Sequence, residues 1–82
     1  MCIVTFEQRR AKIKTLDDLE EQIRLARHYV ARLKRKAKNQ TSLADKLAVH
    51  EDVKKAEQVS KRLRLASFDI EDEILLNQSA IN

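Results

Sequence analysis

The 82-residue sequence contains no glycine and no proline, and this absence excludes several kinds of binding site. Phosphate-binding loops and dinucleotide-binding fingerprints need glycines so that the backbone can approach the phosphates, and the calcium loop of an EF-hand needs one for its sharp turn. Tight β-hairpin turns and the connections of βαβ units also depend on these two residues. The sequence therefore favours an all-α protein with few, simple turns.

Cysteine and histidine are too scarce for a disulfide or a structural metal site. Cys2 is the single cysteine, and Cys2, His28 and His50 together cannot supply the set of four ligands that a structural zinc ion needs. A Cys-His catalytic pair would require Cys2, at the chain end, to reach one of the two histidines. We therefore expect no enzymatic activity, no cofactor, no metal site and no small-molecule substrate.

Long apolar runs are also missing from the chain. A membrane-spanning helix needs about 18 consecutive apolar residues, and no stretch of this sequence approaches that length. The opening MCIVTF is too short for the apolar region of a signal peptide, and Glu7 follows it directly. The expectation is a cytoplasmic protein that does not enter a membrane, and an unpaired Cys2 is compatible with that compartment.

The sequence does contain a strong helical pattern, in a chain that is 37% charged and 43% hydrophobic. Thr15 can cap a helix, with Asp18 placed to complete the cap, and Asn39 can end it in the left-handed conformation. Between these ends, apolar residues recur at alternating spacings of three and four, the pattern of a helix packed against another helix. They are Leu16, Leu19, Ile23, Ala26, Val30, Leu33 and Ala37. The sequence thus predicts a helix over residues 15–38.

A second helix is predicted over residues 43–76, with Ser42 as its cap. Its apolar stripe consists of Val49, Val53, Ala56, Val59, Leu63, Ala66, Ile70 and Ile74. The segment SFDIEDEILL, residues 67–76, either continues this helix or begins a short third helix capped by Ser67. No glycine or proline forces a break there.

Together these segments make one domain, residues 1–82, built as an antiparallel two-helix hairpin with its turn at residues 39–42. Residues 1–14 are interpreted as an N-terminal arm, whose apolar beginning fits a short strand, a docked arm or a helical extension. Residues 77–82 form a tail.

The hairpin brings residues of the two helices face to face. The expected apolar pairs are Leu16 with Leu65, Leu19 with Leu63, Ile23 with Val59, Ala26 with Ala56, and Leu33 with Val49. Opposite charges also meet in this register: Asp17, Asp18 and Glu20 face Lys61, Arg62 and Arg64, while Arg9, Arg10 and Lys12 face the acids of residues 69–73. Each exposed pair of this kind contributes under about 1 kcal/mol.

Both helices carry apolar residues outside the seam, which two helices alone cannot bury. A chain of this size buries about 60% of its unfolded surface and is marginally stable without a partner. We therefore expect a homodimer that forms a four-helix bundle. The expected function is that of a small interaction protein, whether adaptor, chaperone-like or regulatory, that binds a partner protein. The residues expected at this protein-binding surface are Leu25, Tyr29, Leu65, Phe68, Leu75 and Leu76, and burial in the homodimer core explains the same residues.

Residues 26–40 hold six of the seventeen Lys and Arg residues and no acid, which raises an alternative hypothesis. Cations concentrated at the turn end of a hairpin can neutralise phosphates, as in a nucleic-acid-binding regulator. The scarcity of aromatic residues beside these cations disfavours recognition of single strands. The residues expected to contact phosphates are Arg24, Arg27, Arg32, Lys34, Arg35, Lys36, Lys38, Lys54 and Lys55.

Overall fold

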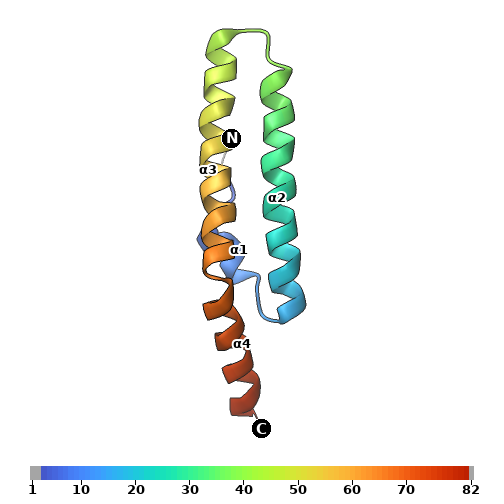
Figure 1. Ribbon diagram of the computed structural model, residues 1–82, viewed down its shortest axis with the longest axis vertical. Helices are drawn as coiled ribbons and strands as arrows, with labels where there is room; N and C mark the ends of the chain where they lie inside the picture. Colours follow the sequence, from blue (N-terminus) through green and yellow to red (C-terminus); the bar gives the residue numbers. More distant parts are fainter. Residues whose placement is uncertain (1–2, 82) are drawn as a thin grey trace.

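The computed structural model describes the backbone of residues 3–81 and the side chains of residues 3–78. Within this part of the chain all regular structure is helical, which confirms the all-α prediction. The molecule is elongated, with principal extents of 57 × 19 × 15 Å (Figure 1). In chain order its helices are α1 (Phe6–Ala11), α2 (Leu16–Lys38), α3 (Leu43–Leu65) and α4 (Ser67–Ile81).

Hydroxyl side chains cap the beginnings of the two long helices. Thr15 Oγ1 accepts a hydrogen bond from the Asp18 N–H at 3.1 Å, and the Asp18 carboxylate accepts one in return from the Thr15 N–H at 3.2 Å. Ser42 Oγ accepts more weakly from the Asp45 N–H, at 3.5 Å. Both predicted caps are confirmed. The left-handed end predicted at Asn39 is wrong: this residue stays right-handed, with φ −89° and ψ −4°, and its N–H bonds the Lys36 carbonyl in a tightened last turn.

Helices α2 and α3 lie side by side and run in opposite directions (Figure 1). Their apolar stripes meet in a seam that contains two clusters of buried residues. The cluster nearer α4 consists of Ile13, Leu19, Ala26, Leu63, Ile70 and Ile74. The cluster nearer the turn consists of Leu33, Ala37, Val49, Val53 and Ala56. The first cluster therefore ties α4 and the α1–α2 connection to the two long helices.

The register of α2 against α3 differs from the predicted one. Ala26 belongs to the cluster of Leu63 and not to that of Ala56. Leu65, expected opposite Leu16, is 72% exposed. The pairs Ala26–Ala56 and Leu16–Leu65 are therefore corrected.

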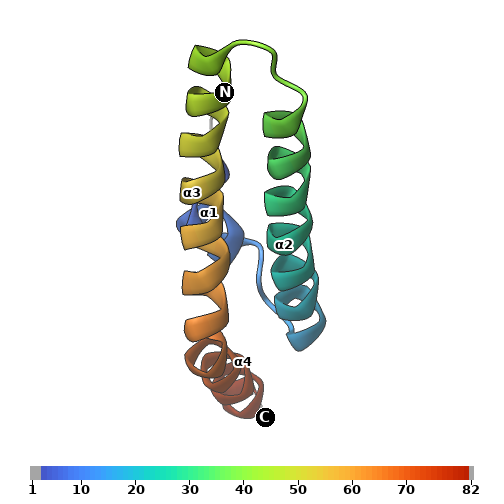
Figure 2. The same ribbon diagram turned by 45° about the horizontal axis from the view of Figure 1, so that its top comes forward.

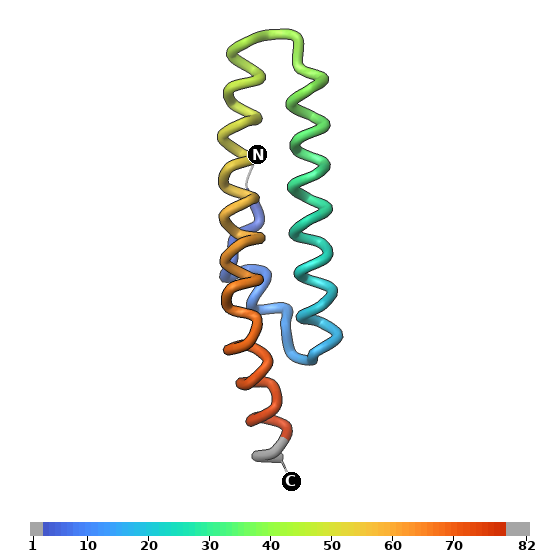
Figure 3. The backbone as a smooth tube through the Cα atoms, viewed as in Figure 1, coloured from blue at the N-terminus to red at the C-terminus, as the bar shows by residue number. Residues whose placement is uncertain are grey.

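The cause of this shift is the link between the two helices, residues 39–42. Figure 3 shows that the link rises beyond the end of α2, so that α3 begins farther along the long axis. The prediction gave the link no length along that axis. Leu19 still shares a cluster with Leu63, and Leu33 with Val49.

The N-terminal arm contains α1, which packs on α3 (Figure 2). Thr5 caps this helix, and Thr5 and Gln8 form a reciprocal capping box with hydrogen bonds of 2.9 and 3.1 Å. Val59 of α3, expected to face Ile23, instead borders a hollow lined by residues of the arm. The prediction gave the arm no separate helix at residues 6–11, and the Thr-x-x-Gln spacing was the available signal for one. Cys2 lies outside the described residues.

Of the two alternatives left open for residues 67–76, the structure has the separate helix: the segment 43–76 divides at Ala66 into α3 and α4. Hydrogen bonds continue through the break, because the Ala66 N–H donates to the Arg62 carbonyl and the Ala66 carbonyl accepts from the Ile70 N–H, both at 2.9 Å, although α4 turns away from the axis of α3 (Figure 2). Ser67 does not act as a cap; its hydroxyl donates back to the Arg64 carbonyl at 2.7 Å. Helix α4 runs to Ile81, so most of the expected tail, residues 77–82, is helical.

The predicted ionic contacts are partly different. Arg10 forms an ion pair with Glu73, as its position opposite residues 69–73 indicated. Arg62, however, pairs with Glu7 of α1 at 3.3 Å and lies over the Phe6 ring, 4.0 Å from its centroid. The Asp18 carboxylate is occupied by its own helix cap. Arg62, which was predicted to face the acids of α2, is therefore paired with the N-terminal arm.

Candidate interaction surfaces

The largest exposed apolar side chains of the C-terminal half lie on α3 and α4. We call this surface the α3–α4 face and define it by Leu65, Phe68, Leu75 and Leu76. Leu65 and Phe68 are 72% and 77% exposed, and Leu76 is 68% exposed. On the other side of α4, Ile70 and Ile74 are buried in the core. Helix α4 thus has apolar residues on two sides. The core of this chain covers one side, and the other is exposed.

The two other residues predicted for protein binding, Leu25 and Tyr29, lie on α2. Leu25 is partly exposed, at 37%. Tyr29 is half-buried against the second core cluster, and the guanidinium groups of Arg9 and Arg32 each lie 5.9 Å from its ring centroid. Four of the six predicted residues are therefore exposed at the end of α3 and on α4, and Tyr29 has partners within the chain.

Two exposed leucines were missed by the prediction. Leu43 and Leu47, in the first turns of α3, are 72% and 58% exposed. Neither residue belongs to the apolar stripe of the second predicted helix. Their position outside that stripe was the sequence signal that they would be exposed.

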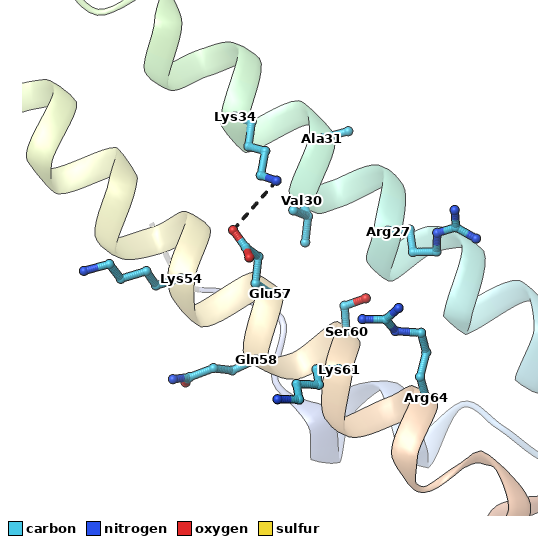
Figure 4. Close-up of a pocket in the computed structure, with 10 residues that line it drawn as sticks. All are labelled: Arg27, Val30, Ala31, Lys34, Lys54, Glu57, Gln58, Ser60, Lys61 and Arg64. Atoms are coloured by element: carbon cyan, nitrogen blue, oxygen red, sulfur yellow. Dashed lines mark ion pairs between the residues drawn. The ribbon is translucent and has the colours of Figure 1, made fainter.

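A basic groove runs between α2 and α3 on the side that α1 leaves open. We call it the α2–α3 groove; it has a volume of about 610 Å³. Its lining residues are Arg27, Val30, Ala31 and Lys34 from α2, and Lys54, Glu57, Gln58, Ser60, Lys61 and Arg64 from α3 (Figure 4). The lining has five cations and one acid, so the groove presents a positive potential to an incoming ligand.

Two features organise the cations of this groove. Lys34 Nζ lies 3.9 Å from Glu57 Oε1, an ion pair that crosses from α2 to α3. Figure 4 shows Arg64 extending from α3 toward α2, so that its guanidinium group lies on the same side of the groove as Arg27. At the turn end, Lys38, Lys46 and His50 line a further hollow that shares Lys34 and Glu57 with the groove. The positive surface therefore continues toward the turn.

The predicted phosphate-binding residues do not form one site. Arg27, Lys34 and Lys54 line the groove, whereas Arg24 pairs with Glu21 of its own helix and Arg32 lies over Tyr29. The remaining predicted cations are on other exposed surfaces or near the turn: Arg35, Lys36, Lys38 and Lys55. Lys61 and Arg64 belong to the groove but were missed, because the predicted register assigned them to the acids at the start of α2.

Opposite the groove, α1 places a charged side chain inside the protein. Arg9 is 6% exposed, and its Nη1 donates to Gln22 Oε1 at 3.1 Å. Burial lowers the pKa of Arg9 from its ordinary value, and the nearby Tyr29 partly opposes this shift. Arg9 therefore fixes α1 on α2 rather than offering a charge to a ligand.

Between residues 3 and 81, no group of three or more His, Cys, Asp or Glu is placed to hold a metal ion. No helix within that range is long and apolar enough to cross a membrane. No family model, curated protein or solved structure matches the chain. The α3–α4 face and the α2–α3 groove are therefore the features of this chain that indicate a function.

Proposed function

We propose that this protein is a non-enzymatic helical interaction protein that self-associates and binds a partner protein. The α3–α4 face supports this most directly, because Phe68 is 77% exposed and the three leucines of the face, Leu65, Leu75 and Leu76, are 43–72% exposed. Large apolar side chains grouped on one face of a helix are typical of a surface that another helix covers.

The simplest cover is a second copy of the chain. Two α2–α3 hairpins would pack as a four-helix bundle, and the α3–α4 face of each would lie in the interface. A chain of 82 residues has little core of its own, so burial between copies supplies area that one copy lacks. A partner protein would be bound on the same face in place of the second copy, through a helix with apolar residues at the matching spacing.

Sedimentation equilibrium at micromolar concentration tests the self-association. We expect a mass well above the 9.6 kDa of one chain for the wild type, and a return toward that mass for Phe68→Glu. Ala11→Glu is a matched control, because it adds the same charge at an exposed position of α1, away from the α3–α4 face. A wild type that remains a folded monomer would contradict self-association.

Partner binding is tested separately, with the tagged protein as bait in an extract of its host. Polypeptides that the wild type captures and Phe68→Glu loses would support the α3–α4 face as the binding surface. Capture that is identical for both proteins would argue against it.

The α2–α3 groove favours one alternative, a nucleic-acid-binding regulator. Its five cations and single acid are suited to contact duplex phosphates, and each neutralised phosphate adds nearly one unit to the dependence of log affinity on log salt. Titration with duplex and single-stranded oligonucleotides at two salt concentrations tests this. Duplex binding that weakens steeply with salt supports the alternative, and absence of binding at low salt removes it.

A further inference from the structure

We infer that the α2–α3 groove receives helix α4 of a second copy of this chain. The inference rests on the self-association proposed above and identifies the two surfaces that produce it. It also says what occupies the groove. The apolar face alone, or the excess of cations alone, does not identify that occupant.

Charge indicates this occupant. The sequence has no Lys or Arg after Arg64, and α4 carries four acids: Asp69, Glu71, Asp72 and Glu73. Among the described residues, Glu73 is the one of these four with an ion pair, to Arg10. The groove has the opposite balance, since Glu57 is its single acid among five cations. The chain therefore carries an acidic helix and a basic groove, and complementary potentials of this kind fix the register of an interface.

The apolar parts of the two surfaces also correspond. Between its cations, the floor of the groove is formed by half-buried Val30 of α2 and buried Ser60 of α3, which point toward each other (Figure 4). Helix α4 offers Phe68 and Leu75, which lie on one side of the helix at 100° per residue. The acids of α4 would then be brought to the cations along the rims of the groove, while the apolar residues fill its floor.

The positions of the two surfaces fit a symmetric dimer. At 100° per residue, Lys54 and Lys61 point to the same side of α3, and Phe68 follows seven residues later, in the first turn of α4. Helix α1 leaves this side open, because it packs against Gln22 and Tyr29 on another side of α2. A two-fold axis across the rod, between the groove and α4, would place α4 of each copy in the groove of the other, an isologous contact that closes on itself.

Charge reversal in two variants tests this pairing. The groove variant combines Arg27→Glu with Lys61→Glu, and the helix variant combines Asp69→Lys with Asp72→Lys; all four side chains are exposed, and circular dichroism checks that each variant folds. We expect each variant alone to self-associate at least about tenfold more weakly than the wild type, measured by sedimentation, because like charges then face each other. An equimolar mixture should associate again, since both contacts of the mixed dimer join opposite charges. Lys12→Glu with Lys14→Glu is the control for an equal change of net charge on exposed positions outside both surfaces.

The possible outcomes separate this inference from the proposed function. If the wild type dimerises and both variants dimerise equally well, the groove is not the contact, although self-association stands. If the wild type is a folded monomer, the self-association itself fails. If the wild type is a monomer and the groove variant has lost salt-dependent binding to duplex DNA, the groove belongs to nucleic acid and the inference is overturned.

Discussion

Arg9 of α1 donates a hydrogen bond to Gln22 of α2 across 3.1 Å, and both side chains are more than 90% buried. Among the described residues the Arg9 Nε atom has no hydrogen-bond partner, and Tyr29 lies beside the guanidinium group. A buried charge with a single neutral acceptor is a weak source of stability, because its desolvation offsets much of what the contact contributes. The role we assign to this contact is to set where α1 docks.

This assignment predicts unequal effects for the two partners of the contact. Arg9→Met removes the buried charge but leaves Gln22 Oε1 without its donor, so the gain and the loss offset and the free energy of unfolding should change by less than about 1 kcal/mol. Gln22→Ala leaves the charge without its acceptor and should lower stability by about 1–3 kcal/mol. Urea denaturation followed by circular dichroism measures both values. A larger loss for Arg9→Met than for Gln22→Ala would show that the contact stabilises the fold.

The register of α3 predicts a strong contrast between two leucines two residues apart. Leu63 is completely buried and Leu65 is 72% exposed. Leu63→Ala should cost about 2–5 kcal/mol of unfolding free energy through the cavity it leaves. Leu65→Ala should change the stability of an isolated protomer by no more than about 0.5 kcal/mol. Thermal melts at several protein concentrations distinguish the two, and a cost for Leu65→Ala that grows with concentration would report burial between copies.

The two-cluster seam predicts which positions of α2 tolerate a charge. Leu33 is 2% exposed, so Leu33→Asp buries an unpaired carboxylate and should unfold the protein. Val30 is half-buried and lines the basic groove, so Val30→Asp should retain a cooperative melt, at a lower temperature than the wild type. Equal melting curves for the two variants would contradict this placement of the seam.

The helix caps predict that removing the cap of α2 lowers the stability of the whole protein, whereas removing the cap of α1 has a local effect. Thr15→Ala removes the cap of a long helix and should lower the stability of the whole protein by about 1 kcal/mol. Thr5→Ala removes the cap of α1, a helix of six residues, and should mainly increase amide hydrogen exchange in residues 6–11. Hydrogen exchange resolved by residue tests this, with the α2 amides of the Thr5→Ala variant as the internal reference.

The long helices could be predicted from the sequence because their signals are local. The spacing of apolar residues from Leu16 to Ala37 defines one face of a helix, and Thr15 marks its beginning without reference to the rest of the chain. The Thr5–Gln8 capping box was equally local, yet the surrounding Arg9 and Arg10 read as part of a charged arm. Periodicity gives little weight to a helix of six residues, since such a helix forms through its tertiary contacts.

The groove could not be predicted, because it depends on register. Lys61 and Arg64 meet Arg27 and Lys34 only after the link at residues 39–42 has displaced α3 along α2. The residue types of this four-residue link do not indicate its backbone conformation, because it contains no glycine or proline that would favour a particular turn. The burial of Arg9 was hidden for a related reason: arginine is rarely found inside proteins, so a sequence pattern places it at the surface.

The hydrogen bonds that continue through Ala66 affect how strongly a partner can bind α4. Because Ala66 bonds both Arg62 and Ile70, α4 leaves the end of α3 as an already formed rod held in one direction. A segment that must first order itself loses conformational entropy at the moment of capture, whereas a rigid one does not. A partner that binds α4 should therefore meet a preformed helix, and loosening the joint with Ala66→Gly should weaken binding, because α4 must then be ordered at the moment of capture.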